Sequence, residues 1–320
     1  MNKHEKYIAR LFFQLKVHQS DGQAFENLFL NVMCKSNTNF QPVKAHGRIG
    51  DMKNDGFDKI LGKYYQIYGP EEIEKKATID NAVTKLNKDF YGLKEKWHSS
   101  CPIKEFYYVV NDKYKGCPAP IHQELIKLEK DNLNIKFNVF SAHHLEDLFL
   151  KLSEEDITGV IGLIPDMEVD FLDYNDLNEV ISFILNLETD ISFEPKLELP
   201  DFEEKIKFNR LSDRIGIWLT SSSYQIGDLE QYFQVNGENI SNDLNTKFKD
   251  LYDKSKGIIP DDTEYCEDKR FLYILQQACP NNKKVVRDAV LILMAYYFES
   301  CDIFEKPEEV LKDDITSKTR

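Results

Sequence analysis

The stretch HGRIGDMKNDGFDKILGKYYQIYGPEE, residues 46–72, decides the fold of the first half of this chain. It places two carboxylates, Asp51 and Asp55, in a glycine-rich turn, and the short aromatic strand YYQIY follows at 64–68. Alternation along that strand puts Gln66 and Tyr68 on one face. A carboxylate before one strand and an amide oxygen on the next are hard oxygen ligands of the kind that Mg²⁺ binds. The stretch therefore predicts a strand pair that carries a divalent-cation site.

The segments on either side of this stretch predict an α/β domain. Helical periodicity and strand-like alternation define the expected elements. We expect helices over 4–18, 21–35, 71–97, 118–130 and 143–152, and strands over 40–43, 56–60, 64–68, 103–110 and 135–140. This order is typical of a central sheet flanked by helices.

The character of the chain changes after GVIGLIPD, which ends at Asp166. The remainder shows helical patterns, over 174–188, 202–222, 226–234, 238–256, 267–279 and 284–300. The sequence therefore predicts two domains: an α/β domain over 1–165, and an all-α domain over 166–320 for partner docking or oligomerisation.

The net charge of −14 is unfavourable for an enzyme that acts on nucleic acid, unless the charge is segregated along the chain. Lys and Arg outnumber the acidic residues between 35 and 63, around Asp55. Asp and Glu dominate between 166 and 205. The basic flank could contact phosphates and the acidic segment favours a protein partner, although both could also be ordinary solvated surfaces.

Composition argues against several classes of protein. No apolar run is long enough to span a membrane, and the N-terminal residues lack the apolar core of a signal peptide. We therefore expect a cytoplasmic protein with no membrane partner. The six cysteines have no CxxC spacing, which argues against a zinc site or a disulfide scaffold and favours reduced, buried thiols.

Phosphodiester hydrolysis is a reaction that suits the predicted cation site. A bound divalent cation polarises a phosphoryl oxygen and lowers the pKa of a water. Asp55 is the expected primary ligand, and Gln66 offers a side-chain oxygen. Glu26, on the preceding amphipathic helix, could orient a ligand or bind a second cation. Asn-Asp-Gly is also a common turn, in which case Asp55 would be structural.

Three motifs together resemble the Mrr-like branch of the PD-(D/E)XK nuclease superfamily. They are Glu26, GDMKNDG at 50–56 and YQIY at 65–68, and the resemblance covers about residues 5–165. It implies a restriction-endonuclease-like αβββαβ core and an enzyme that cleaves double-stranded DNA with Mg²⁺ or Mn²⁺. The metal ligands that it implies are Asp55, Gln66, Asp51 and Glu26.

Tyr68 departs from the family pattern, which has a catalytic lysine two residues after the position of Gln66. Three alternatives stay open for an active nuclease: a migrated Lys53, a migrated Lys63, or the Tyr68 hydroxyl as donor. The departure also fits a catalytically inert nuclease fold that serves as a DNA-binding adaptor. We expect phosphate contacts from the basic flank, at Lys44, Arg48 and Lys53.

A second resemblance lies near the C-terminus. The segment AVLILMAYYFESCDIFEKP, residues 289–307, is similar to the C-terminal domain of nuclease subunits in ABC-three-component systems, which are grouped with the Lamassu anti-phage defence family. It implies two partners, an SMC-like or Rad50-like ATPase subunit and a small middle subunit. It also implies that these partners restrain cleavage and that the active nuclease is a homo-oligomer. A buried core helix is the plainer explanation of the apolar residues.

The leading hypothesis from the sequence is a Mg²⁺-dependent DNA endonuclease that acts as a defence effector. The inert DNA-binding adaptor is one alternative. The other is a stand-alone restriction endonuclease whose helical domain reads DNA, and the acidic second half of the chain argues against it.

Overall fold

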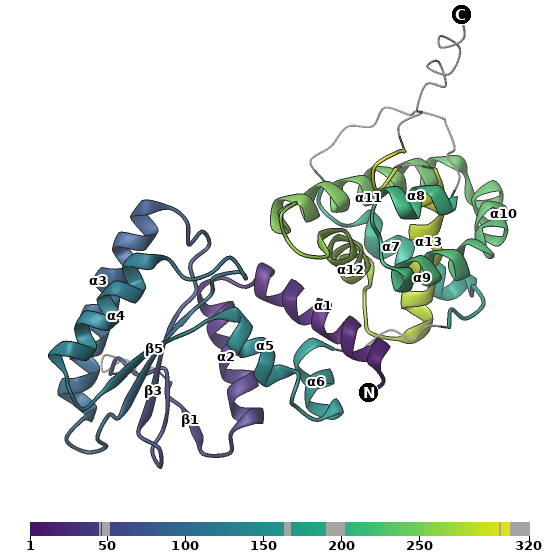
Figure 1. Ribbon diagram of the computed structural model, residues 1–320. Helices are drawn as coiled ribbons and strands as arrows, with labels where there is room; N and C mark the ends of the chain where they lie inside the picture. The colour runs from purple at the N-terminus through teal and green to yellow at the C-terminus, as the bar shows by residue number, and fades with distance from the viewer. Residues whose placement is uncertain (45, 47–51, 163–167, 190–201, 301, 308–320) are drawn as a thin grey trace, which may run out of the picture. The chain divides into compact units, whose positions relative to one another are not determined.

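The computed structural model describes residues 1–44, 46, 52–162, 168–189, 202–300 and 302–307. The chain divides into two compact units, Met1–Ile164 and Pro165–Arg320 (Figure 1). Within the described ranges, the strands belong to the first unit and the second unit is helical.

A five-stranded mixed sheet forms the centre of the first unit. Its strands lie side by side in chain order: β1 (Phe40–Pro42), β2 (Gly56–Asp58), β3 (Lys63–Tyr68), β4 (Glu105–Val110) and β5 (Lys136–Phe140). The first three strands pair antiparallel, whereas β3, β4 and β5 pair parallel. Parallel neighbours need crossover connections, and these contain the helices α3 (Lys76–Trp97) and α4 (Ala119–Asp131).

Helices cover both faces of this sheet. Figure 1 shows α3 and α4 along one face, and α2 (Gly22–Ser36) and α5 (Ala142–Phe149) along the other. The unit also contains α1 (Lys3–Gln19) and α6 (Glu154–Ile161). Tyr64 of β3 shares a core cluster with Phe90 of α3, whereas the ring of Tyr65 lies 5.6 Å from that of Phe29 in α2. Because side chains alternate along a strand, Gln66 lies on the α3 face with Tyr64.

The expected order of elements in the first unit is confirmed. Several of the expected boundaries differ from those observed, and for two of them the contacts give the physical cause. The strand expected over 56–60 ends at Asp58, because the carboxylate of Asp58 accepts hydrogen bonds from the amides of Ile60 and Leu61 and closes a turn. The helix expected from residue 71 begins at Lys76, since the turn before it carries Ile73 into the core.

Helix α6 is absent from the sequence-based expectation, although its start carries a clear signal. Ser153 is the N-cap residue, and its hydroxyl accepts a hydrogen bond from the amide of Asp156 at 3.1 Å. Three acidic residues follow in the first turn, where they interact favourably with the helix dipole.

The second unit is built from helices, as the sequence predicts. They are α7 (Tyr174–Leu185), α8 (Phe202–Phe208), α9 (Asp213–Ser223), α10 (Ile226–Asn236), α11 (Glu238–Ile258), α12 (Cys266–Ala278) and α13 (Lys284–Glu299). The apolar residues of α13 are mostly buried, with Val285 exposed, and this helix packs against α7, α9 and α10. The core-helix explanation of the segment from 289 onward is therefore correct for its apolar part.

The single helix expected over 202–222 is in fact two, α8 and α9. Arg210 between them adopts a left-handed backbone conformation with φ 52°, which no α-helix continues through. Ser212 then serves as the N-cap residue of α9, and its amide donates to Asp268 Oδ1 at 2.9 Å. In the sequence, Ser212 is a helix-start signal inside an otherwise continuous helical pattern.

None of the helices in the described ranges is both long enough and apolar enough to cross a bilayer. The five cysteines that the structure describes are free thiols, in agreement with the absence of a disulfide pattern in the sequence. The expectation that they are buried is wrong, because Cys34 is exposed and the other four are partly exposed.

Candidate active site

Asp55 and Gln66 lie together where β2 diverges from β3. The β2–β3 ladder ends at the pair Gly56–Tyr65, so the peptide groups of Ile67 lie beyond it. The Ile67 amide donates to Asp55 Oδ2 at 2.6 Å, and Gln66 Nε2 donates to the same oxygen at 2.8 Å. Asp55 and Gln66 are 6% and 4% exposed. The two residues that the sequence identifies as the main ligands are thus in direct contact.

Buried polar atoms without a hydrogen-bond partner lie in and next to this pair. Gln66 Oε1 is buried and has no hydrogen-bond partner within the described part of the chain. The same is true of both side-chain polar atoms of Asn54, the fully buried neighbour of Asp55. A buried polar atom without a partner costs about 1–3 kcal/mol. Such groups are rare in protein cores, and a bound ligand or water would satisfy them.

Two residues of α3, Lys85 and Asp89, join the cluster although the sequence-based hypothesis does not include them. Lys85 Nζ donates to the Ile67 carbonyl at 3.2 Å and lies 3.6 Å from Asp89 Oδ2. Asp89 is buried on the core-facing side of α3, beside Leu86 and Phe90. A carboxylate among the apolar positions of an amphipathic helix is the signal that could have identified it. For Lys85, the sequence offers no signal other than its position one turn before Asp89.

Lys53 reaches the same carboxylate from the turn that precedes β2. Its Nζ lies 2.8 Å from Asp89 Oδ1. Met52 and Lys53 both adopt the left-handed backbone region, with φ 55° and 66°, which is strained for residues other than glycine. Trp97 of α3 stabilises this turn by donating its indole N–H to the Met52 carbonyl at 3.2 Å. Lys53, one of the two predicted migrated lysines, is therefore part of the cluster.

Tyr68 and Lys63 point to other partners. The Tyr68 hydroxyl donates to the Thr78 carbonyl in the first turn of α3 at 3.2 Å, and burial raises the pKa of this phenol. Lys63 lies on the opposite face of β3, where its Nζ is 3.5 Å from a carboxylate oxygen of Glu105. The structure does not bring either side chain to Asp55 as the sequence-based alternatives require.

The other predicted residues are only partly located. Glu26 is half-buried in α2, and its neighbour Phe25 packs against Gly69, directly after β3. This places that turn of α2 near the strand end that carries Gln66. Lys44 is exposed in the segment after β1. Arg48 and Asp51 lie outside the described residues.

The donor atoms of the cluster fit magnesium. The Asp55 carboxylate, Gln66 Oε1 and the Ile67 carbonyl are hard oxygen ligands, which Mg²⁺ prefers over nitrogen or sulfur. No group of three His, Cys, Asp or Glu side chains within the described residues could form a metal cage. Mg²⁺ does not require one, since it is commonly bound by one or two carboxylates, with water and substrate phosphate as further ligands.

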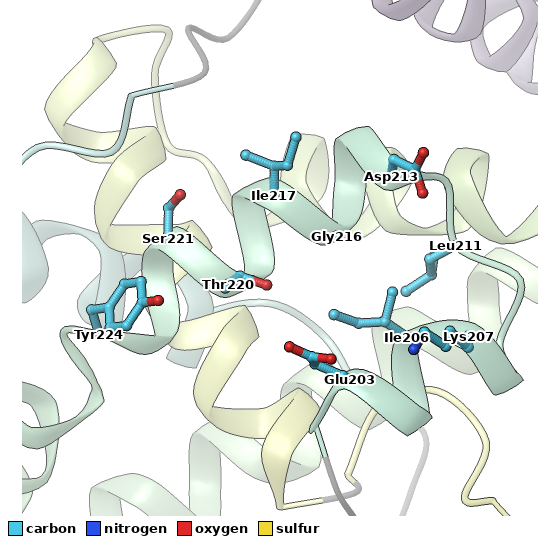
Figure 2. Close-up of a pocket in the computed structure, with 10 residues that line it drawn as sticks. All are labelled: Glu203, Ile206, Lys207, Leu211, Asp213, Gly216, Ile217, Thr220, Ser221 and Tyr224. Carbon is cyan, nitrogen blue, oxygen red and sulfur yellow. The ribbon is translucent and has the colours of Figure 1, made fainter.

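A separate pocket of about 540 Å³ lies in the second unit, between α8 and α9 (Figure 2). Ile206 lies between the two helices, and Gly216 allows their close approach, because a Cβ at this glycine would lie 3.4 Å from the Ile206 side chain. The charged side chains on its rim are exposed: Glu203, Lys207 and Asp213. Active sites hold desolvated titratable groups, so this lining does not indicate catalysis.

Comparison with known proteins concerns this second unit. Residues 175–305 match the family model of C-terminal domain 10 of the ABC-three-component (ABC-3C) systems. This part of the second unit is similar to that ABC-3C domain. The match confirms the association with ABC-three-component systems that residues 289–307 indicate, and it points to a component of such a defence system. No curated protein and no solved structure matches the chain.

Proposed function

We propose that this chain is a metal-dependent DNA endonuclease and the effector subunit of an ABC-three-component defence complex of the Lamassu type. The first unit would cleave double-stranded DNA, and the second would bind the other subunits. One observation carries the nuclease part. Gln66 Nε2 and the Ile67 amide converge on a single oxygen of Asp55, while Gln66 Oε1 has no donor within the described residues.

The residues of the first unit would share the work as follows. Asp55, Gln66 Oε1 and the Ile67 carbonyl would hold Mg²⁺ or Mn²⁺, with Asp51 and Glu26 as further carboxylates. When bound, the cation polarises a phosphoryl oxygen and lowers the pKa of a water. Lys44 and Arg48 on the basic flank would attract the phosphates of DNA. Contacts of lysine and arginine with phosphates contribute to affinity for any DNA sequence.

The second unit supports the partner part of the proposal. Its family match is to a domain of multi-component systems, and its first residues are strongly acidic. An acidic surface repels DNA and suits contact with protein. We propose an SMC-like or Rad50-like ATPase subunit and a small middle subunit as partners. Their release would permit self-association of the nuclease and cleavage.

Plasmid cleavage tests the nuclease proposal. The full chain would be incubated with supercoiled plasmid and Mg²⁺ or Mn²⁺, alone and together with the other subunits of its complex. We expect cleavage by the parent and a loss of at least about a hundredfold in Asp55→Asn and Gln66→Ala, since both changes remove ligands of the cation.

Asp58→Asn is the matched control for Asp55→Asn. It makes the same chemical change three residues further on, at the end of β2, but Asp58 uses its oxygens for the turn after that strand. Cleavage should therefore survive it. Cleavage by Asp55→Asn at the parent's rate would contradict the proposed site.

The catalytically inert DNA-binding adaptor is the second candidate, because the residue at the lysine position is a tyrosine whose hydroxyl makes a structural hydrogen bond to Thr78. DNA binding without cleavage in Mn²⁺ and in the presence of the partner subunits would favour this candidate.

A further inference from the structure

A lysine on α3 reaches the strand position at which a lysine side chain is missing. Lys85 Nζ lies 5.5 Å from the centroid of the Tyr68 ring and donates to the carbonyl of Ile67. The Tyr68 ring itself stacks on that of Tyr108, with centroids 5.9 Å apart. The tyrosine thus provides an aromatic surface, and the ammonium over it is attracted by the ring electrons. An amine is therefore present next to Gln66 although β3 does not supply it.

Asp89 is the group that keeps this amine in place. A buried carboxylate is costly unless it is paired, and Asp89 is 1% exposed. It pairs with two lysines, Lys53 at 2.8 Å and Lys85 at 3.6 Å. An apolar residue at this core-facing position would stabilise α3 more, since replacing buried ion pairs by apolar groups is often neutral or stabilising. Asp89 is better explained as an anchor for ammonium groups than as a contribution to stability.

The two lysines differ in what they can reach. Lys53 runs across Gly92, where a Cβ would lie 3.0 Å from Lys53 Cγ, and so meets Asp89 from the strained turn before β2. Lys85 touches both Asp89 and the Ile67 carbonyl, the main-chain group next to Gln66. Its side chain is 42% exposed, so the ammonium also faces solvent and an incoming ligand.

We propose that Lys85 is the cationic group of this site, in the place of the lysine absent at position 68, and that Asp89 positions it. The inference rests on the proposed function, because it assigns a residue to the same site. In the structure the ammonium is bound to a carbonyl that we also propose as a ligand of the divalent cation. The two positive charges compete for that oxygen, and Asp89 is the partner to which Lys85 can move. Near the phosphodiester, the ammonium would then stabilise the negative charge that develops during cleavage.

The test compares Lys85→Met with Lys88→Met in the full chain. Lys88 is the matched control, because it is an exposed lysine of the same helix, one turn further on. Mn²⁺ affinity is measured by titration calorimetry, plasmid cleavage is measured in parallel, and the melting temperature of each variant checks folding. A charge within about 4–6 Å changes an ionisation equilibrium by tenfold or more, and the same Coulomb energy, here a repulsion, acts between the Lys85 ammonium and a metal ion.

We therefore expect Lys85→Met to bind Mn²⁺ about tenfold more tightly than the parent and to cleave at least about a hundredfold more slowly. Lys88→Met should match the parent in both. Asp89→Asn should slow cleavage and weaken Mn²⁺ binding, because Lys85 then keeps the Ile67 carbonyl and a nearby negative charge is lost.

Each result decides between distinct conclusions. Equal Mn²⁺ affinity in Lys85→Met and Lys88→Met, or parental cleavage by Lys85→Met, overturns the role of Lys85 and leaves the proposed metal site intact. If the parent alone does not cleave plasmid, the Mn²⁺ affinities of the variants still decide the role of Lys85. If the parent binds no Mn²⁺ at all, the proposed function fails at its metal site and the inference fails with it.

Discussion

Two lysines, one in each unit, show how differently this chain treats a positive charge. Lys205 in the second unit is fully buried, and its Nζ donates to the carbonyls of Phe298 and Ile303 at 2.6 and 2.8 Å. It also lies 4.4 Å from the centroid of the Phe298 ring. Lys85 in the first unit is partly exposed and is shared between a carbonyl and a carboxylate.

The difference separates a structural charge from a functional one. Lys205 donates to the Phe298 carbonyl in the last turn of α13 and to the Ile303 carbonyl just after that helix, and so fastens α8 to this end of the chain segment. Lys85 binds the carbonyl of Ile67, the residue after Gln66, and the buried Gln66 Oε1 has no donor within the described residues. A charge enclosed by its partners stabilises the fold. A charge that is shared between two acceptors, with spare acceptors nearby, can exchange partners when a ligand arrives.

Lys205→Met should have the largest effect on stability and none on the site. The carbonyls of Phe298 and Ile303 would lose this donor. The net cost is about 2 kcal/mol, because the substitution also removes a buried charge. Thermal unfolding of the full chain should show a lower transition for the helical unit, with Mn²⁺ binding unchanged. Lys207→Met, an exposed lysine of the same helix, is the control. An unchanged transition would mean that Lys205 is not structural.

Asp58→Asn should destabilise the first unit by about 1 kcal/mol at neutral pH, in a pH-dependent manner. Burial raises the pKa of Asp58, but hydrogen bonds from Leu61, Asn37 and Ile60 outweigh it, so the pKa lies below its usual value. A carboxyl group with a depressed folded-state pKa adds stability above its unfolded pKa and loses it as the pH falls through the folded value. The difference between parent and variant should therefore shrink below about pH 4 in urea unfolding. A constant difference would contradict the assignment.

Lys63→Ala should have the smallest effect. Its pair with Glu105 joins side chains that are 27% and 28% exposed, and such pairs are worth less than about 1 kcal/mol. We expect parental cleavage and a shift in unfolding free energy of at most about 0.5 kcal/mol. A tenfold loss of cleavage in Lys63→Ala would instead indicate that Lys63 is the migrated lysine of the site.

The sequence predicts the contact of Asp55 with Gln66 because both lie in one short stretch, where strand alternation and a tight turn determine the neighbours. It does not predict Lys85. The side chain that reaches β3 comes from the next helix, and the distance between them depends on how α3 packs on the sheet. Lysines are common on helices, and only the buried Asp89 distinguishes this one from Lys88.

The same limit of sequence-based prediction applies to the second unit. Periodicity identifies helices and the buried face of α13, because burial and period are linked. It misses the break at Arg210, which adopts a left-handed conformation without the glycine that usually marks one. The buried Lys205 is also invisible in the pattern, since a lysine among helical residues ordinarily faces solvent.

The most direct test of the account is a Mn²⁺ titration of the full chain and of Asp55→Asn by calorimetry, with Asp58→Asn as control. We expect the parent and Asp58→Asn to bind Mn²⁺, and Asp55→Asn to bind it at least about a hundredfold more weakly, because the carboxylate is the principal charged ligand. Equal affinity in Asp55→Asn and the parent, or no binding by the parent, would contradict the claim that Asp55, Gln66 and Ile67 form a metal site.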